Sequence, residues 1–205
     1  MELKQEKLDN KAQLRQRILD QASLLLTEEG PQALSMRKLS KQVGASTIVL
    51  YTYFQNKQDI FNELYLEGFA RLRQDLETVP VHENPLEYVM DLGRAYRNSA
   101  VKNPTYYQIM FSQSVPDFTP PPESLEKSQQ SFNVLVKAVQ RCRDANILKP
   151  GDVLEIAQVL WGTLHGMVSL ELFGYFSSKK SGKERLEEAM LILKEGLIHI
   201  EGETI

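Results

Sequence analysis

The sequence has 205 residues, of which 42% are hydrophobic and 25% are charged, and its formal net charge is −3. This length and composition predict a soluble protein with a packed core, built as one medium domain or as a small domain joined to a larger one. The single cysteine excludes an internal disulfide and fits a reducing compartment.

The first predicted helix runs from about Asn10 to a break at Gly30-Pro31. Its apolar stripe, spaced as one face of a helix requires, consists of Leu14, Ile18, Ala22, Leu25 and Leu26. This stripe supplies a wall against which the next two helices, too small to fold alone, can bury their inner faces. Residues 1–10 are expected to be a frayed terminus. The alternative is that this end of the chain reaches flanking phosphates through Lys4, Lys7 and Lys11.

Residues 35–57, SMRKLSKQVGASTIVLYTYFQNK, predict two short helices separated by a tight turn. Leu39 and Val43 share one face of the first helix. Gly44 ends that helix, because glycine takes the left-handed conformation of a C-terminal cap without steric cost. Ser46 caps the second helix through its hydroxyl. A helix, a glycine-containing turn of about three residues and a second helix have the spacing of a DNA-binding helix-turn-helix.

The second helix of this pair is predicted to turn Leu50 and Phe54 onto the first helix and its opposite side outward. The residues on and around that outer side are Thr47, Ile48, Val49, Tyr51 and Thr52. None of them is Arg, Lys, Asn or Gln, so contacts with thymine methyl groups suit this surface better than bidentate hydrogen bonds. Arg37, near the start of the preceding helix, is the side chain able to bind a guanine edge.

The same segment is locally basic, although the whole chain is net negative. No acidic residue lies between Glu29 and Asp59, and the basic residues there are Arg37, Lys38, Lys41 and Lys57. A local excess of positive charge is expected where a protein meets the phosphates of DNA. The alternative from the residues alone is the solvated face of a small all-α domain that does not touch DNA.

These residues also resemble a known family. The run Gly44-Ala45-Ser46, followed by residues 50–54 (LYTYF) and Lys57, is similar to the N-terminal signature of the TetR family of bacterial transcriptional regulators. The resemblance covers about residues 10–65, with Tyr53 standing where histidine is commoner in the family. It implies contacts with bases for Arg37, Thr47, Ile48, Val49, Tyr51 and Thr52. It implies phosphate contacts for Tyr53 and Lys57.

The remainder of the chain is predicted to be helical. A helix capped by Asn56 continues to about Glu77, and a break at residues 79–85 ends it. Further helices are expected over residues 86–100, 105–111, 125–146, 152–176 and 186–200, with a proline-rich loop over residues 114–122. We therefore expect an all-α fold. Residues 1–55 would form a three-helix DNA-binding domain, and residues 56–205 a helical ligand-binding and dimerisation domain.

The apolar stretch over residues 153–176 is interrupted by Glu155, Gln158, His165 and Glu171, which favours a buried helix over a membrane span. Together with the absence of an apolar signal-peptide core, this predicts a cytoplasmic protein. Two helices from each of two chains would make an isologous four-helix interface, which predicts a homodimer. The residues predicted at this interface are Gly162, Gly166, Leu186, Met190, Leu193 and Leu197.

Large side chains with polar tips, typical of a mostly apolar pocket, are also present. The predicted ligand-binding residues are Tyr106, Tyr107, Met110, Phe111, Trp161 and His165. From the residues alone, ordinary core packing is the alternative. The family resemblance implies a small-molecule inducer that releases operator DNA. Residues 161–166 (WGTLHG) also resemble a tryptophan-histidine-glycine motif in the C-terminal domain of one TetR subgroup.

Other functional classes find less support. There is no phosphate-binding loop and no paired metal-ligand motif, and the three histidines are scattered at positions 82, 165 and 199. We expect no enzyme activity, no cofactor and no metal. Cys142 lies on an apolar stripe and is expected to be packed and inert, despite its arginine neighbours.

The expected function is a ligand-responsive regulator, most simply a repressor, of a palindromic double-stranded operator. The alternative is a helical protein-binding adaptor without DNA-binding activity.

Overall fold

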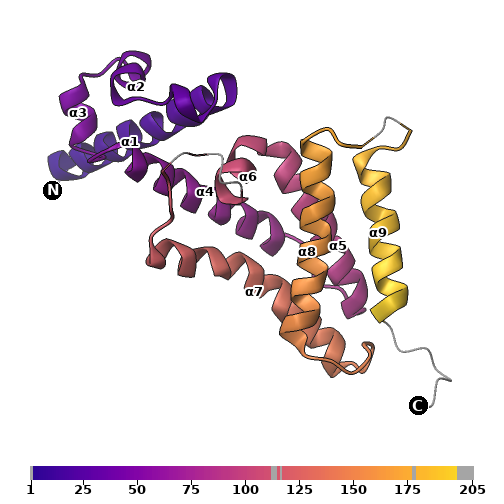
Figure 1. Ribbon diagram of the computed structural model, residues 1–205. Helices are drawn as coiled ribbons and strands as arrows, with labels where there is room; N and C mark the ends of the chain where they lie inside the picture. The colour runs from indigo at the N-terminus through magenta and orange to yellow at the C-terminus, as the bar shows by residue number, and fades with distance from the viewer. Residues whose placement is uncertain (1, 112–114, 116, 177–178, 198–205) are drawn as a thin grey trace. The chain divides into compact units, whose positions relative to one another are not determined.

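The computed structural model describes residues 2–111, 115, 117–176 and 179–197, with side chains described from Asn10 onward. Within these ranges the chain is built from helices (Figure 1), which confirms the expected all-α fold. The helices are α1 (Glu2–Glu29), the short η1 (Pro31–Ala33), α2 (Met36–Val43), α3 (Thr47–Tyr51), α4 (Lys57–Glu77), α5 (Pro85–Lys102), α6 (Pro104–Phe111), α7 (Pro122–Asp144), α8 (Val153–Leu172) and α9 (Gly182–Leu197).

Two helix boundaries differ from those predicted. Helix α1 begins at Glu2 instead of near Asn10, because residues 2–9 are mostly good helix formers without a glycine or proline. Helix α8 ends at Leu172 instead of near residue 176, since Gly174 takes a left-handed conformation with φ 74°. Parts of the predicted loop over residues 114–122 and of the last helix beyond residue 197 lie outside the described residues.

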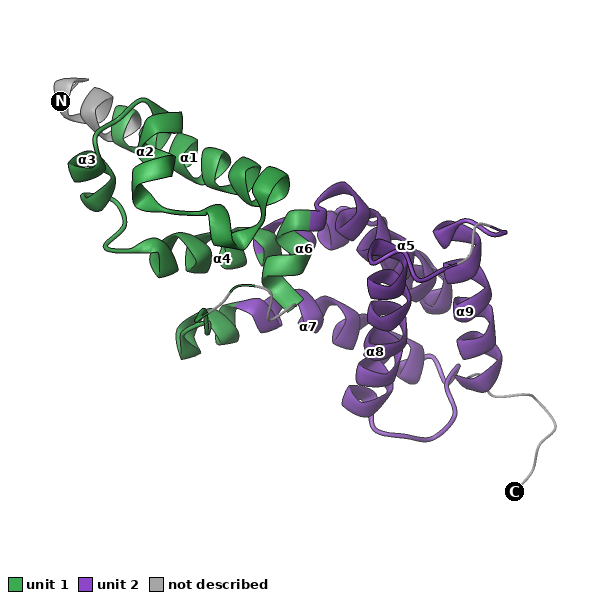
Figure 2. Ribbon diagram, turned by 45° about the horizontal axis from the view of Figure 1, so that its top comes forward, with its two compact units in different colours: residues 1–69, 105–127 green, residues 70–104, 128–205 purple. Residues whose placement is uncertain are grey.

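The chain divides into two compact units (Figure 2). Unit 1 comprises residues 1–69 and 105–127, and unit 2 comprises residues 70–104 and 128–205. The division differs from the predicted domain boundary after residue 55. The first part of α4 groups with unit 1 because Phe61, Leu64 and Tyr65 are buried in the core of that unit.

In unit 1, α1 provides the wall expected for the helix-turn-helix. Ile18 and Leu25 of α1 are fully buried in one cluster with Leu39 of α2 and Leu50 of α3. Each fully buried aliphatic side chain contributes about 1.5–3 kcal/mol of transfer free energy. This burial holds a five-residue helix that would not be stable alone.

In unit 2, α8 and α9 lie alongside each other and both pack against α5 (Figure 1). Met90, Leu164, Leu186 and Met190 are buried together at this junction. Gly93 of α5 permits the close approach, because a Cβ there would lie 2.7 Å from the sulfur of Met190.

Helix α8 is the one described helix whose length and composition would suit a membrane span. Instead, Ala157, Leu160, Leu164 and Val168 make a buried stripe along it. The cover is one-sided, because α8 also carries exposed apolar side chains at Leu154, Val159 and Leu170. The sequence predicted a buried helix, whereas the described residues of the single chain cover α8 on one side only.

Candidate DNA interface and regulatory site

The turn between α2 and α3 is built from the local caps that the sequence predicts. Gly44 has φ 72° and ends α2 in the left-handed conformation. The Ser46 hydroxyl accepts a hydrogen bond from the backbone N–H of Val49 at 3.3 Å. The Ser35 hydroxyl does the same for Lys38 at the start of α2, at 3.2 Å. Both short helices therefore begin and end at fixed residues.

Helix α3 has one buried and one exposed side. Leu50 is 0% and Phe54 2% exposed, whereas Ile48 is 77% exposed. The burial predicted for Leu50 and Phe54 is thereby confirmed. Tyr51 and Thr52 are also exposed, and Thr47 and Val49 are half-buried. The Thr52 hydroxyl donates to the Val49 carbonyl at 2.6 Å.

The basic residues around this surface differ in their surroundings. The side chains that are exposed to solvent are those of Arg37, Lys41 and Lys57. Lys38 is half-buried and forms an ion pair with Glu29. Lys57 is the first residue of α4, whose start is capped as predicted. The Asn56 side-chain oxygen accepts from the Gln58 N–H at 2.7 Å and from the Asp59 N–H at 3.2 Å.

Two residues of α1 contribute to this region: Lys11, which the sequence suggested as a possible phosphate contact, and Arg17, which it did not single out. The Lys11 amine lies 5.9 Å from the centre of the half-buried Tyr53 ring. Arg17 donates to the Val43 carbonyl at 3.2 Å, at the C-terminal end of α2. Lys11 thus adds a positive charge beside a predicted phosphate-binding residue, and Arg17 ties α1 to α2. The side chains of Lys4 and Lys7 lie outside the described part.

Two family models match the chain. The model of the bacterial regulatory proteins of the tetR family matches residues 18–64, which contain the helix-turn-helix. The model of the tetracyclin repressor-like C-terminal domain matches residues 89–193, just over half of the chain.

The chain belongs to the TetR family. It is a DNA-binding transcriptional regulator and not an enzyme, which removes the support for a helical adaptor that ignores DNA.

Related proteins agree with this membership. The HTH-type transcriptional regulator Rv1816 of Mycobacterium tuberculosis is 21% identical over 199 residues, covering 83% of this chain and 85% of that protein. A solved structure from Rhodococcus sp. RHA1 matches with a TM-score of 0.81 and 25% identity, covering 91% of this chain and 96% of that one. The TetR family regulator PfmR from Thermus thermophilus has the same fold, with a TM-score of 0.70, 21% identity, and coverage of 89% and 100%.

The six predicted ligand-binding residues are divided between the two units. Four of them, on α6, belong to unit 1. Tyr106 is buried in the core of that unit, and the rings of Tyr107 and Phe111 lie 5.0 Å apart. Trp161 and His165 belong to unit 2, with ring centres 5.7 Å apart. Their role in binding a ligand stays a prediction.

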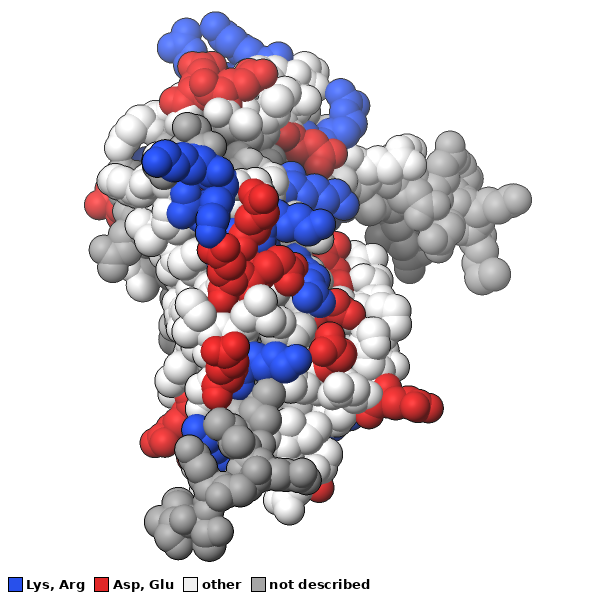
Figure 3. Space-filling model, turned by 90° about the vertical axis from the view of Figure 1, so that its right-hand side faces the viewer, with Lys and Arg blue, Asp and Glu red and all other residues white. Residues whose placement is uncertain are grey.

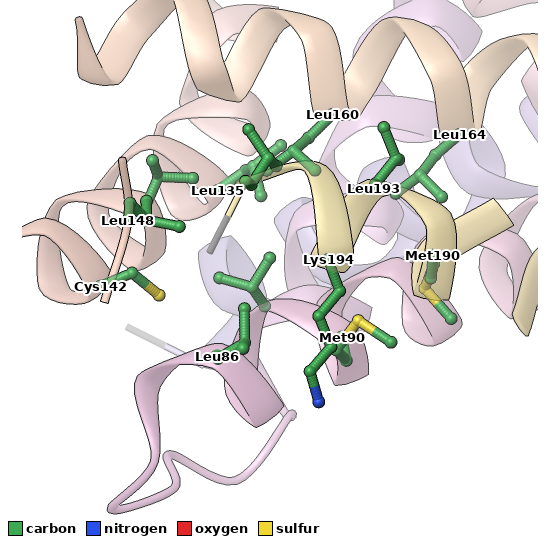
Figure 4. Close-up of a pocket in the computed structure, with 13 residues that line it drawn as sticks. Leu86, Met90, Leu135, Cys142, Leu148, Leu160, Leu164, Met190, Leu193 and Lys194 are labelled. Carbon is green, nitrogen blue, oxygen red and sulfur yellow. The ribbon is translucent and has the colours of Figure 1, made fainter. Parts of the chain in front are cut away.

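A different set of residues encloses a cavity within unit 2, among α5, α7, α8 and α9 (Figure 4). Leucine, valine and methionine side chains and Cys142 line it, and Lys194 is its one charged lining residue among those described. The centre of a water molecule can occupy about 30 Å³ of this cavity, and all the empty space between its walls, including solvent at the mouth, is about 510 Å³. None of the six predicted ligand-binding residues lines this cavity. Sequence periodicity could not have found it, because its walls come from four separate helices.

His165 has a defined setting on α8. Its Nδ1 lies 2.9 Å from the Tyr96 hydroxyl of α5, and its Nε2 lies 3.5 Å from the Ser169 hydroxyl. Burial lowers the pKa of the His165 imidazole. The neutral ring is therefore the form that the folded protein favours.

Cys142 is 1% exposed, and burial raises the pKa of its thiol to about 11. The neighbouring Arg141 lowers that pKa, but its effect is smaller. The thiol is therefore protonated near neutral pH, in agreement with the packed, inert cysteine expected from the sequence.

The predicted dimer-interface residues fall into two groups. No atom lies within 4 Å of a Cβ placed on Gly162 or on Gly166, so this side of α8 is open in the single chain. Leu186 and Met190 are instead buried inside unit 2, and Leu193 and Leu197 are half-buried there. The apolar side chains that α9 exposes are Leu191 and Ile192.

Polar residues of unit 2 are paired with one another. Arg94 of α5 donates from Nε and Nη2 to the two carboxylate oxygens of Glu187 on α9, both at 2.8 Å, and from Nη1 to Asp91 at 2.6 Å. The hydrogen bonds from Arg94 lower the pKa of both carboxyl groups. On the face that Figure 3 shows, positive and negative side chains are likewise interleaved.

Proposed function

We propose that the protein is a ligand-responsive repressor that binds a palindromic operator as a homodimer and is released by a small molecule bound in its C-terminal part. The observation that carries the proposal is the outward surface of α3. The buried side chains of Leu50 and Phe54 anchor one side of this helix in the core, while Ile48 is exposed to solvent on the other side. A helix presented in this way can enter the major groove of a duplex. With the bacterial chromosome as its partner, the protein is cytoplasmic.

The residues assigned to DNA are those of the helix-turn-helix. Arg37 reads a guanine, and α3 contacts thymine-rich steps through Thr47, Ile48, Val49, Tyr51 and Thr52. Tyr53 and Lys57 hold phosphates. The exposure of Ile48, Tyr51 and Lys57 supports these roles.

The homodimer is assigned to the outer faces of α8 and α9. Gly162 and Gly166 allow a second helix to approach, and Leu191 and Ile192 add exposed apolar surface. Two such helix pairs make a four-helix interface related by a two-fold axis. A two-fold dimer places its two α3 helices on half-sites about 34–36 Å apart, one turn of DNA.

Release by a ligand follows from a shift between two dimer geometries. A small molecule that favours a geometry unsuited to successive major grooves weakens operator binding. The pairing of Trp161 with His165 supports assignment to the subgroup with the tryptophan-histidine-glycine motif. Trp161 also packs on Phe132 of α7, with ring centres 5.6 Å apart.

The test is an electrophoretic mobility shift with the DNA that flanks the protein's own gene. We expect a saturable shift that competitor DNA of unrelated sequence does not remove. The Ile48→Asp variant is expected to abolish the shift without unfolding the protein, because Ile48 is exposed and the new carboxylate repels phosphate. Binding by Ile48→Asp as tight as that of the original protein would contradict the assignment of α3 to DNA.

A further inference from the structure

The cavity of unit 2 suits an apolar chain. Its lining consists of aliphatic side chains, two methionines and one protonated thiol, with Lys194 as the exception. Apolar walls of this kind favour contact with apolar groups over contact with water. Met90 and Met190 are unbranched, so they can move aside as a guest enters the cavity. The lining residues do not offer the set of hydrogen-bonding groups that a sugar or a nucleotide would need.

Lys194 supplies one positive charge at the edge of this apolar wall. Figure 4 shows its side chain running past Met90, with the amine at the periphery of the lining residues. Its ion-pair partner among the described residues is Glu87, at 3.7 Å, and the two side chains are 33% and 46% exposed. This separation is too long for a hydrogen bond, and exposed pairs of this kind contribute little to stability. The ammonium can therefore exchange Glu87 for another carboxylate.

We propose that this cavity binds a carboxylate with a short alkyl chain. The chain lies among the leucine and methionine side chains, and the carboxylate pairs with Lys194 in place of Glu87. The inference rests on the ligand-responsive function proposed above and deepens it by naming the chemical class of the ligand and its site.

The position of the cavity connects it with the proposed dimer surface. Met190, Leu193 and Lys194 line the cavity from the inner side of α9. Leu191 and Ile192 are exposed on the same helix. A guest that displaces the inner side chains therefore acts on the helix that carries the outer ones. A ligand bound in the cavity can therefore change the proposed dimer interface by moving α9.

Isothermal titration calorimetry with sodium octanoate tests the site. Octanoate is expected to bind saturably. The affinities of 1-octanol and octylammonium should be at least about tenfold lower, because one charged hydrogen bond is lost.

Variants test the role of Lys194. Lys194→Met keeps the apolar stem and removes the charge, so it should lower the affinity for octanoate about tenfold and leave that for 1-octanol unchanged. Lys183→Met is the matched control on the exposed surface of α9 and should change neither affinity. Glu87→Gln removes the competing carboxylate and should tighten octanoate.

Methyl NMR of the methionines locates the guest. Octanoate should shift the methyl resonances of Met90 and Met190 and leave that of Met36 in unit 1 unchanged. Equal binding of octanoate and 1-octanol, equal losses for Lys194→Met and Lys183→Met, or unshifted Met90 and Met190 signals would overturn the proposal. The operator shift without octanoate reports separately on the proposed function. A protein that binds its operator but not octanoate therefore loses this inference alone.

Discussion

Arg37 and Lys57 are both exposed cations of the helix-turn-helix, and we expect their positions to give them different roles in binding DNA. Arg37 lies in the first turn of α2, and Lys57 is the first residue of α4. A guanidinium can bind a guanine edge through two hydrogen bonds, whereas an ammonium beside a helix N-terminus binds phosphate as a point charge. Arg37 should therefore determine a preference for one base pair, whereas Lys57 should raise the affinity for DNA of any sequence.

Arg37→Ala is expected to relax the preference for guanine at one operator position, at a cost of about 1–3 kcal/mol for the preferred base pair. Lys57→Ala should weaken all sequences alike and reduce the slope of log affinity against log salt by about one. Selection from a random DNA library and salt titration measure the two effects. A uniform loss for Arg37→Ala would reassign this residue to the backbone.

His165 links the folded state to pH. Because burial lowers its pKa, the unfolded chain binds a proton at pH values where the folded chain does not. The resulting stability is complete above the unfolded pKa of about 6.5 and is lost as the pH falls through the lowered folded value. Urea unfolding between about pH 8 and about pH 5 should therefore show a smaller loss for His165→Gln than for the original protein. Equal losses in the two proteins would contradict the lowered pKa of the half-buried His165 ring.

At the scale of elements, a charged pair joins α5 to α8 within unit 2. Arg97 donates to the two carboxylate oxygens of Glu171, from Nε at 2.7 Å and from Nη2 at 2.5 Å, and both side chains are largely buried. The first residue of α9 lies against this pair. A Cβ added to Gly182 would come within 1.9 Å of the Glu171 carboxylate. Glycine at this position therefore leaves room for the ion pair.

Gly182→Ala is expected to push Glu171 away from Arg97 and to destabilise the protein by about 2 kcal/mol, the range of a charged hydrogen bond. Gly196→Ala is the matched control on α9, because a Cβ there meets no atom within 4 Å. It should be neutral or stabilising by up to about 1 kcal/mol. Chemical denaturation measures both variants. Equal stability of the two variants would show that Glu171 moves aside without cost.

At the scale of the whole molecule, the proposed homodimer would cover the exposed apolar residues of α8 and α9. Val159 of α8 and Ile192 of α9 are 56% and 70% exposed, although both lie on long, well-formed helices. Exposed apolar surface is typical of protein interfaces, which supports the proposed homodimer. We propose that the second chain approaches most closely at Gly162 and Gly166, where an added Cβ meets no atom within 4 Å.

Gly162→Leu is expected to shift the protein from dimer to monomer in analytical ultracentrifugation, by at least about tenfold in the dissociation constant. The helix content should not change, because a Cβ at this position meets no atom of its own chain within 4 Å and leucine is a good helix former. Lys137→Leu, at an exposed position on α7, controls for the added leucine. An unchanged dimer in Gly162→Leu would move the interface away from this face.

The sequence by itself determined the helix-turn-helix. The spacing of Leu39 and Val43, the left-handed Gly44 and the hydroxyl of Ser46 act within a few residues of one another, so local chemistry was sufficient. The cap at Asn56 and the inert state of Cys142 were predicted for the same reason, from neighbours in the chain and an apolar stripe.

Only the tertiary structure decided which face of each C-terminal helix meets its own chain. Helix α9 has apolar residues on two sides, and the sequence predicted Leu186 and Met190 for a partner, whereas the structure buries them and exposes Leu191 and Ile192. The sequence also did not predict the cavity. Nor did it predict the ion pair of Arg97 with Glu171, which are 74 positions apart in the chain. Periodicity predicts that a helix has an apolar stripe, but the partner of that stripe is decided by packing between residues far apart in the chain.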